Sequence, residues 1–331
     1  MIDSINFRIE NIDYLDFKQL YQKGIRVDDI TSSNPITGFT NRCYVFKYNG
    51  ATFKFNRSNK TILIYASPHK ILNKRDITLS NFKEYTLKLE EILIKVFDTS
   101  NVNIQLDRID FCCDIPLTED DAKTYISFLR FNKIRYKYMK QKNTYATSIY
   151  IKTERGKTNL NIYMRQPKTN SELDRGILRI EVQCKKELIK SEYDKYEIPK
   201  VLEYYWSEEA IEEYFFNFLK GYLYEGDYYT LEDARKIINN SNCNPDMKRK
   251  LKNFVKHVSS YYLSNLMDPK FCKDMRLHYS YATINNYIKK LDAINVNPIT
   301  IQKLQGVNIN KKILPNLLKL ARQTAEDKYF K

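Results

Sequence analysis

The chain has 331 residues, with 55 Lys and Arg against 40 Asp and Glu, a net charge of +15 and a hydrophobic fraction of 43%. A chain of this length and apolar content can bury a full core, and with only 8 glycines it belongs to neither the collagen-like nor the low-complexity class. The positive charge indicates a polyanionic partner, nucleic acid ahead of an anionic membrane surface, although a generally lysine-rich proteome would produce the same total.

The first section of the chain is typical of antiparallel strands. Apolar residues alternate with polar ones, and Asn49-Gly50 predicts a tight turn between two strands before Pro68 closes the section. A helix with Ser80 as its N-cap is expected next, over residues 81–97. The strands are expected over residues 5–9, 43–48, 51–55 and 61–65.

More strands follow, with a helix that begins after Thr118 inserted among them. They are expected over residues 102–115, 133–139, 145–152, 158–165 and 177–184.

Beyond Lys185 the pattern becomes helical. Helices are expected over residues 202–223, 231–239, 247–266, 281–293 and 299–320. We therefore expect an α+β domain over residues 1–190, with an antiparallel sheet and flanking helices, and a mostly helical domain over residues 191–331.

Charge is segregated along the chain. Residues 130–168 hold eleven Lys or Arg and one acid, and residues 270–331 hold twelve bases and four acids. Residues 201–235 hold nine acids and two bases. Two separate contacts with a phosphate backbone explain this pattern better than a general need for solubility.

The sequence gives no support for a cysteine-based metal site, a nucleotide-binding loop or a histidine-based active site. The six cysteines form no Cys-x-x-Cys pair, and no glycine-rich nucleotide loop occurs. The three histidines, His69, His257 and His278, are isolated in sequence, and a loop position is favoured over a ligand role for His69. No signal peptide and no run of 18 apolar residues is evident, so we expect a cytoplasmic protein with reduced thiols and no membrane contact.

Three of the predicted strands carry reactive side chains opposite their apolar face. Alternation puts Asp110 and Asp114 on one strand, Tyr163 on a second and Glu181 on a third. Carboxylates on neighbouring strands are the oxygen ligands that Mg²⁺ or Mn²⁺ prefers. The alternative is structural: Asp110 pairs with Arg108 or Arg179, and Asp114 simply ends a strand.

Tyr163 is a candidate nucleophile because basic residues surround it in the sequence and could hold a scissile phosphate. The candidate phosphate-binding residues are Arg165, Arg155, Lys157 and Lys152, and Lys137 and Lys140 are expected to contact the rest of the DNA strand. The alternative is that Tyr163 stacks on a base or packs at a sheet edge.

Five segments, taken in order, resemble the gene II replication proteins of filamentous phages and related phage and plasmid initiators. They are Met1-Ile-Asp, Tyr65-Ala-Ser-Pro-His-Lys70, Arg108-Ile-Asp110, Asn161-Ile-Tyr163-Met-Arg165 and Leu178-Arg-Ile-Glu181-Val. The resemblance covers about residues 1 to 220.

The resemblance implies a rolling-circle replication initiator that nicks and joins origin DNA through a covalent 5′-phosphotyrosine. It implies that Tyr163 is the nucleophile and that Asp110 and Glu181 bind the metal, while Asp114 has no counterpart. The expected partners are single- and double-stranded origin DNA, a host helicase and a DNA polymerase, and the chain is compatible with a homodimer. Two alternatives remain, a non-catalytic module that binds single-stranded nucleic acid and a conjugative relaxase with the same chemistry.

Overall fold

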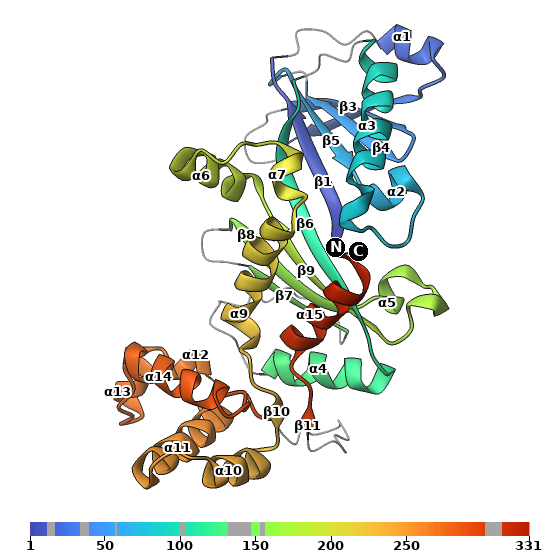
Figure 1. Ribbon diagram of the computed structural model, residues 1–331. Helices are drawn as coiled ribbons and strands as arrows, with labels where there is room; N and C mark the ends of the chain where they lie inside the picture. Colours follow the sequence, from blue (N-terminus) through green and yellow to red (C-terminus); the bar gives the residue numbers. More distant parts are fainter. Residues whose placement is uncertain are drawn as a thin grey trace.

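A nine-stranded antiparallel sheet organises the computed structural model (Figure 1). The structure describes residues 1–11, 17–33, 40–56, 58–98, 103–131, 147–152, 156–261, 263–301 and 313–330. The strand order is β2-β3-β4-β5-β1-β6-β9-β8-β7. The strands are β1 (Ile2–Ile9), β2 (Val27–Ser33), β3 (Thr40–Tyr48), β4 (Ala51–Asn56), β5 (Thr61–Ala66), β6 (Gln105–Pro116), β7 (Ser148–Lys152), β8 (Thr158–Met164) and β9 (Ile177–Cys184). The predicted α+β class with a large antiparallel sheet is confirmed.

The strands lie close to their predicted ranges, with two differences. The strand β2 was not predicted, and the strand expected over residues 133–139 lies outside the described residues. The predicted turn is confirmed: Asn49 and Gly50 have positive φ angles of 42° and 84°. A Cβ on Gly50 would lie 2.8 Å from the carbonyl carbon of Lys70, so this turn requires glycine.

Helices cover the apolar face of the sheet. In the core, Tyr85 of α3 packs on Trp206, with ring centroids 5.1 Å apart, and Phe111 of β6 stacks on Tyr214 at 6.4 Å. The helices that accompany the sheet, on either face or at its edges, are α1 (Phe17–Gln22), α2 (Pro68–Leu72), η1 (Leu79–Asn81), α3 (Phe82–Phe97), α4 (Glu119–Phe131), α5 (Gln166–Thr169), η2 (Glu172–Asp174), α6 (Lys186–Tyr196), α7 (Leu202–Tyr205), α8 (Glu208–Ile211), the π-helical η3 (Glu212–Asn217), α9 (Phe218–Leu223) and α15 (Leu317–Lys328).

The buried residues form two clusters that divide the chain differently from the expected boundary at residue 190. The first cluster contains buried residues of the sheet and of residues 202–228, 299–301 and 314–329, and the second lies within residues 234–296. The second cluster belongs to a helical unit made of α10 (Leu231–Asn240), α11 (Pro245–Tyr261), α12 (Leu263–Leu266), α13 (Pro269–Asp274) and α14 (Tyr281–Asp292). The helical unit therefore interrupts the chain that builds the sheet core, and α15 returns to pack on β6.

The connection between the two cores differs from the helix expected over residues 299–320. Residues 313–314 form β11, which pairs with β10 (Tyr228–Tyr229), and α15 begins only at Leu317. Residues 302–312 lie outside the described residues. The physical reason for the late start is local: the Asn316 side chain accepts hydrogen bonds from the backbone N–H groups of Leu318 and Lys319 and so caps the helix there.

Two buried asparagines stabilise this connection. The Asn297 side chain donates to the carbonyl oxygens of Leu223 at 2.8 Å and Gly226 at 3.0 Å, and Asn316 donates to Gly226 at 2.6 Å. Gly226 lies so close to the returning chain that a Cβ there would be 2.2 Å from the carbonyl carbon of Val296. The connecting segments are thus packed backbone against backbone.

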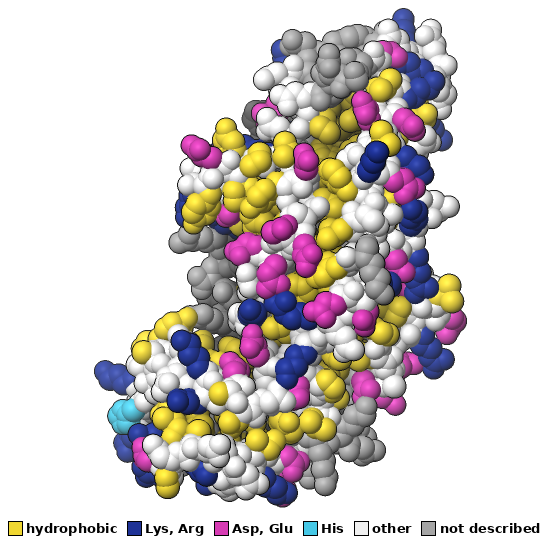
Figure 2. Space-filling model, in the orientation of Figure 1, with side chains coloured by type: hydrophobic (Ala, Val, Ile, Leu, Met, Phe, Trp, Pro, Cys, Tyr) yellow, Lys and Arg dark blue, Asp and Glu magenta, His cyan; other side chains and the backbone are white. Residues whose placement is uncertain are grey.

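The charge segregation seen in the sequence is also visible on the surface. In Figure 2, Asp and Glu side chains gather over the middle of the molecule, where α8 and η3 lie, while Lys and Arg are frequent on the helical unit. The outer surface of α8 and η3 is therefore acidic, and phosphate would be repelled from it. Among the described residues, no helix is both long enough and apolar enough to cross a membrane.

Candidate active site

The opposite face of the sheet is polar where β6, β9 and β8 lie side by side. Because directly opposed residues on neighbouring strands point to the same side, the register aligns side chains from the three strands in rows. These rows, which we call the polar face, are Asp114–Arg179–Tyr163, Cys112–Glu181–Asn161 and Asp110–Gln183–Asn159. The predicted strands therefore share a sheet, and their acids and tyrosine lie on one surface.

Tyr163 is held between an acid and a base. Its hydroxyl donates to Oε2 of Glu181 at 3.2 Å, and Nζ of Lys168 lies 3.0 Å from the same hydroxyl and 4.3 Å from the ring centroid. Only 8% of Tyr163 is exposed. Burial, together with the charge of Glu181, raises the pKa of Tyr163, so the phenol is protonated at neutral pH. A nucleophile in this state needs a base, and Glu181 is in contact with its proton.

Glu181 is fixed in place by two amides. Its Oε1 accepts from Nδ2 of Asn161 at 3.2 Å and from Nε2 of Gln183 at 2.6 Å, while Oε2 faces the tyrosine. These partners orient the carboxylate without neutralising it. Within the described part of the chain, arginines hydrogen-bond to Asp110 and Asp114, whereas the hydrogen bonds of Glu181 come from Asn161, Gln183 and Tyr163.

Asp110 forms the ion pair that was the structural alternative in the sequence. Arg108 donates to its two oxygens at 2.7 and 2.6 Å, in a bidentate contact. Asp110 is 1% exposed, and burial raises its pKa to about 7 although Arg108 acts in the opposite direction. A carboxylate bound in this way offers no free oxygen pair to a hard dication, so the geometry of Asp110 does not fit the expected metal site.

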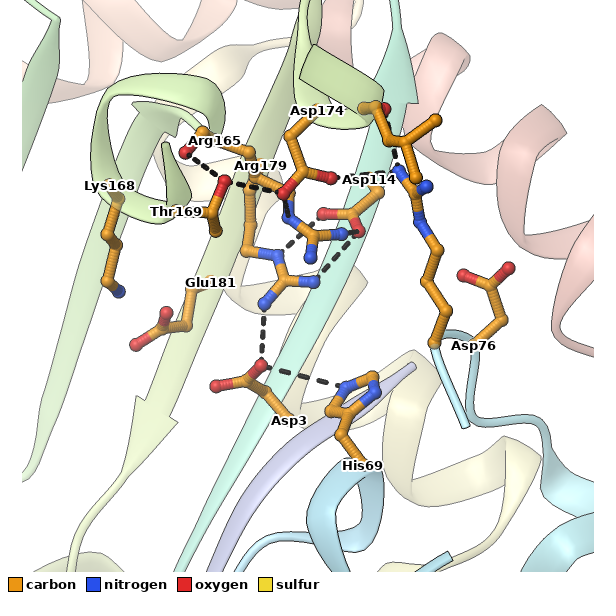
Figure 3. Close-up of polar contacts among 12 residues, drawn as sticks. Asp3, His69, Asp76, Asp114, Arg165, Lys168, Thr169, Asp174, Arg179 and Glu181 are labelled. Atoms are coloured by element: carbon orange, nitrogen blue, oxygen red, sulfur yellow. Dashed lines mark hydrogen bonds and ion pairs between the residues drawn. The ribbon is translucent and has the colours of Figure 1, made fainter. Parts of the chain in front are cut away.

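Asp114 is enclosed by two arginines (Figure 3). Arg179 donates to its oxygens at 2.6 and 2.8 Å, and Arg165 also bonds to Oδ2. Burial opposes ionisation of Asp114, but the hydrogen bonds and charges of the two arginines outweigh it and lower the pKa. Arg179 also donates to Asp3 of β1 at 2.6 Å. Asp114 is thus a structural anion at the centre of an ion-pair network, and it does not fit the metal-ligand role either.

A basic cleft of about 620 Å³ opens beside Tyr163. Its lining contains one acid, Asp3, and a larger set of cations: Lys70, Lys74, Arg75, Arg165, Lys168 and Arg179. A second cleft, of about 460 Å³, is also lined by Tyr163 and Lys168. Tyr163 therefore borders two clefts, and the first is positively charged, so that an extended polyanion is attracted toward the tyrosine.

The predicted phosphate-binding residues differ in their exposure and in their contacts. Arg165 is 14% exposed in its side chain and pairs with Asp114 and Asp174, so it orders the network instead of reaching into solvent. Lys157 donates to the Ser191 hydroxyl at 2.7 Å, and Lys152 is exposed. The three remaining candidates, Arg155, Lys137 and Lys140, lie outside the described residues.

The comparisons with known proteins find similarity among solved structures. No family model matches the sequence, and no curated protein matches it. Among solved structures, the chain is similar to a rolling circle replication initiator protein from Geobacillus stearothermophilus, with 10% sequence identity and a TM-score of 0.33. The similarity covers 56% of this chain and 73% of the other.

Sequence reasoning missed three residues of this site. Lys168 follows Tyr163 by five positions, and its place on the short helix α5 turns it back over the ring. Asp3 and His69 both fall in segments that carry the family resemblance, but no role was attached to them. His69 was expected in a loop; it lies on α2, which begins at Pro68 because proline is well suited to a first helical position.

Proposed function

We propose that the protein is a rolling-circle replication initiator that nicks and rejoins one DNA strand through Tyr163. The observation that carries the proposal is the contact of one phenol with both Glu181 and Lys168 beside a basic cleft. The phenolic oxygen has a proton acceptor and a cation in direct contact, which is the arrangement that activates a nucleophile.

In the proposed reaction, Glu181 takes the proton of Tyr163 as the phenolic oxygen attacks the phosphorus. A bond forms between Oη and phosphorus, the bond from phosphorus to the 3′ oxygen breaks, and that oxygen takes up a proton from water. Lys168 stabilises the phenolate and the charge that develops on the phosphate. The products are a 5′-phosphotyrosine, which preserves the phosphodiester energy for rejoining, and a 3′ hydroxyl that a host polymerase can extend.

The helical unit is the candidate contact for double-stranded origin DNA. Residues 234–296 contain twelve Lys or Arg and four acids, so this unit carries a net positive charge separate from that of the cleft. In the proposal, the unit holds the duplex while a single strand, exposed by a host helicase, enters the cleft.

The proposal is tested by incubating the protein with a supercoiled plasmid that carries its own origin, with and without Mn²⁺. We expect nicked DNA bound covalently to the protein, and mass spectrometry after nuclease digestion should place the attached nucleotide on Tyr163. Binding without any adduct under all conditions would contradict the proposal and favour a non-catalytic binding module. An adduct at a transfer origin, with no nicking of the replication origin, would favour a conjugative relaxase.

Glu181→Gln separates catalysis from binding. The amide keeps the shape of the side chain but cannot take the phenolic proton, so we expect the nicking rate to fall by about 10²–10⁴-fold, the usual contribution of a general base. The affinity for single-stranded DNA, measured by fluorescence anisotropy, should change little. An unchanged nicking rate would exclude Glu181 as the base. Glu172→Gln is a suitable control because Glu172 is exposed and lies on η2 of the same domain.

A further inference from the structure

Three potential metal ligands from distant parts of the chain meet at the edge of the polar face. The ligand atoms of Asp3, His69 and Cys112 all lie within 4.8 Å of one another. Within the described part of the chain, these three residues form the group of His, Cys, Asp or Glu side chains close enough together to hold a metal ion. Asp3 lies on β1, His69 on α2 and Cys112 on β6, in the row of Glu181. Asp3 and His69 also line the basic cleft, and Figure 3 shows the two side chains pointing toward each other.

The hydrogen bonds of His69 determine which ring nitrogen is free. Its Nδ1 lies 3.1 Å from the carbonyl oxygen of Lys74, which can only accept, so Nδ1 carries the proton. In the neutral ring, Nε2 then presents a lone pair. This atom is buried and has no hydrogen-bond partner, and it lies 3.7 Å from Oδ1 of Asp3, too far for a hydrogen bond.

A buried lone pair that faces a carboxylate is unfavourable unless something positive lies between the two atoms. Two ligand atoms at bond lengths of about 2.0–2.3 Å in a tetrahedral site are roughly 3.3–3.7 Å apart. The observed separation of Nε2 and Oδ1 is close to this range. An imidazole whose other nitrogen donates to a backbone carbonyl is also the usual arrangement of a metal-binding histidine.

We propose that Asp3, His69 and Cys112 form a binding site for a transition-metal dication of the zinc type, with its open coordination position facing the basic cleft. Nitrogen, sulfur and carboxylate oxygen together suit Zn²⁺ or Co²⁺ and disfavour Mg²⁺, which prefers oxygen ligands alone. Binding transfers one proton from the Cys112 thiol to solvent. The site differs from the expected one at Asp110 and Asp114, where both carboxylate oxygens accept from arginine; in Asp3 only Oδ1 does so.

The residues around the site support this role. Arg179 donates to Oδ1 of Asp3 at 2.6 Å and the Ser4 hydroxyl donates to Oδ2 at 3.1 Å, so the carboxylate is oriented by its neighbours. The charge of Arg179 is shared with Asp114, so Asp3 is not its sole counter-ion. Tyr163 lines the same cleft as Asp3 and His69, which places the open position on the path of a phosphate that approaches the tyrosine.

The test is a titration of the metal-free full-length protein with Co²⁺, followed by absorption spectroscopy. We expect one bound Co²⁺ per chain, with tetrahedral d–d bands and a thiolate-to-cobalt charge-transfer band. His69→Ala should weaken binding at least about 10-fold, and Cys112→Ser should remove the charge-transfer band. Zn²⁺ should displace the cobalt, whereas Mg²⁺ in excess should not.

His278→Ala is the matched control and should bind Co²⁺ as the wild type does, since His278 lies in the helical unit. Circular dichroism establishes that each variant is folded. Absence of Co²⁺ uptake by the wild type, or equal uptake by folded His69→Ala, would overturn the proposal. This site does not rest on the nicking reaction: a chain that binds Co²⁺ but forms no DNA adduct would contradict the proposed function alone.

Discussion

Replacing Tyr163 by Phe is expected to abolish the covalent attachment of DNA. The substitution removes the single oxygen that Glu181 and Lys168 both contact and leaves the ring in its packed position. Since Tyr163 is the tyrosine whose hydroxyl contacts both Glu181 and Lys168 in the described part of the chain, the nicking rate should fall by at least about 10⁴-fold, as expected when a covalent nucleophile is lost. The measurement is denaturing gel electrophoresis of labelled DNA, which separates free from protein-linked strands.

Tyr150→Phe provides the matched control. Tyr150 lies on β7, next to the tyrosine strand, and is directly opposite Asn161 in the register. This variant should form the adduct at a rate close to that of the wild type. If Tyr163→Phe still forms it at that rate, another tyrosine is the nucleophile, and the contact among Tyr163, Glu181 and Lys168 has a different purpose.

Asp114→Asn is expected to reduce the free energy of unfolding by about 3–5 kcal/mol, the usual cost of removing one partner from a buried ion pair. The substitution leaves the guanidinium groups of Arg179 and Arg165 buried without their shared carboxylate. The measurement is urea denaturation at neutral pH. Asp28→Asn is the control: Asp28 pairs with Arg26 on the surface, and its loss should cost no more than about 1 kcal/mol.

The effect of Asp114→Asn should depend on pH in a defined direction. Because the folded-state pKa of Asp114 is lowered, its ion pairs stabilise the fold above the unfolded-state pKa, near 3.9. This stabilisation is lost as the pH falls through the lower folded-state value. The stabilities of the wild type and the variant should therefore begin to converge below about pH 4 and become equal below the folded-state pKa. A difference that persists unchanged to lower pH would mean that shape, and not charge, causes the effect.

The chemistry of each strand could be predicted from the sequence, but the contacts between strands could not. A period of two places Asp110, Asp114, Tyr163 and Glu181 on the polar side, and the structure has them there. Which arginine meets which acid depends on register, which alternation does not determine. The ion pair of Asp110 with Arg108 is the exception, because two residues two apart on one strand share a face whatever the register.

Sequence patterns do not predict which residues from distant segments of the chain join the site. Asp3 joins the site because β1 lies beside β6 in the strand order, and His69 because α2 follows β5 beside it. The periodicity of α15 predicts an amphipathic helix but not the partner of its apolar face. Its return to β6, where the Cys113 thiol approaches the Ala321 carbonyl oxygen at 3.6 Å, is long-range packing that local sequence does not encode.

The helical unit is inserted into the sheet domain, and this has a mechanical consequence. A domain appended at a chain end has one tether and can swivel, whereas this unit is joined to the sheet core on both sides, before α10 and after α14. The amides of Asn297 and Asn316 fasten the two connections to each other. In the proposed reaction, DNA bound to the helical unit would therefore stay at a nearly constant distance and angle from Tyr163. This fixed geometry would determine which phosphate along the strand reaches Tyr163 and is cut.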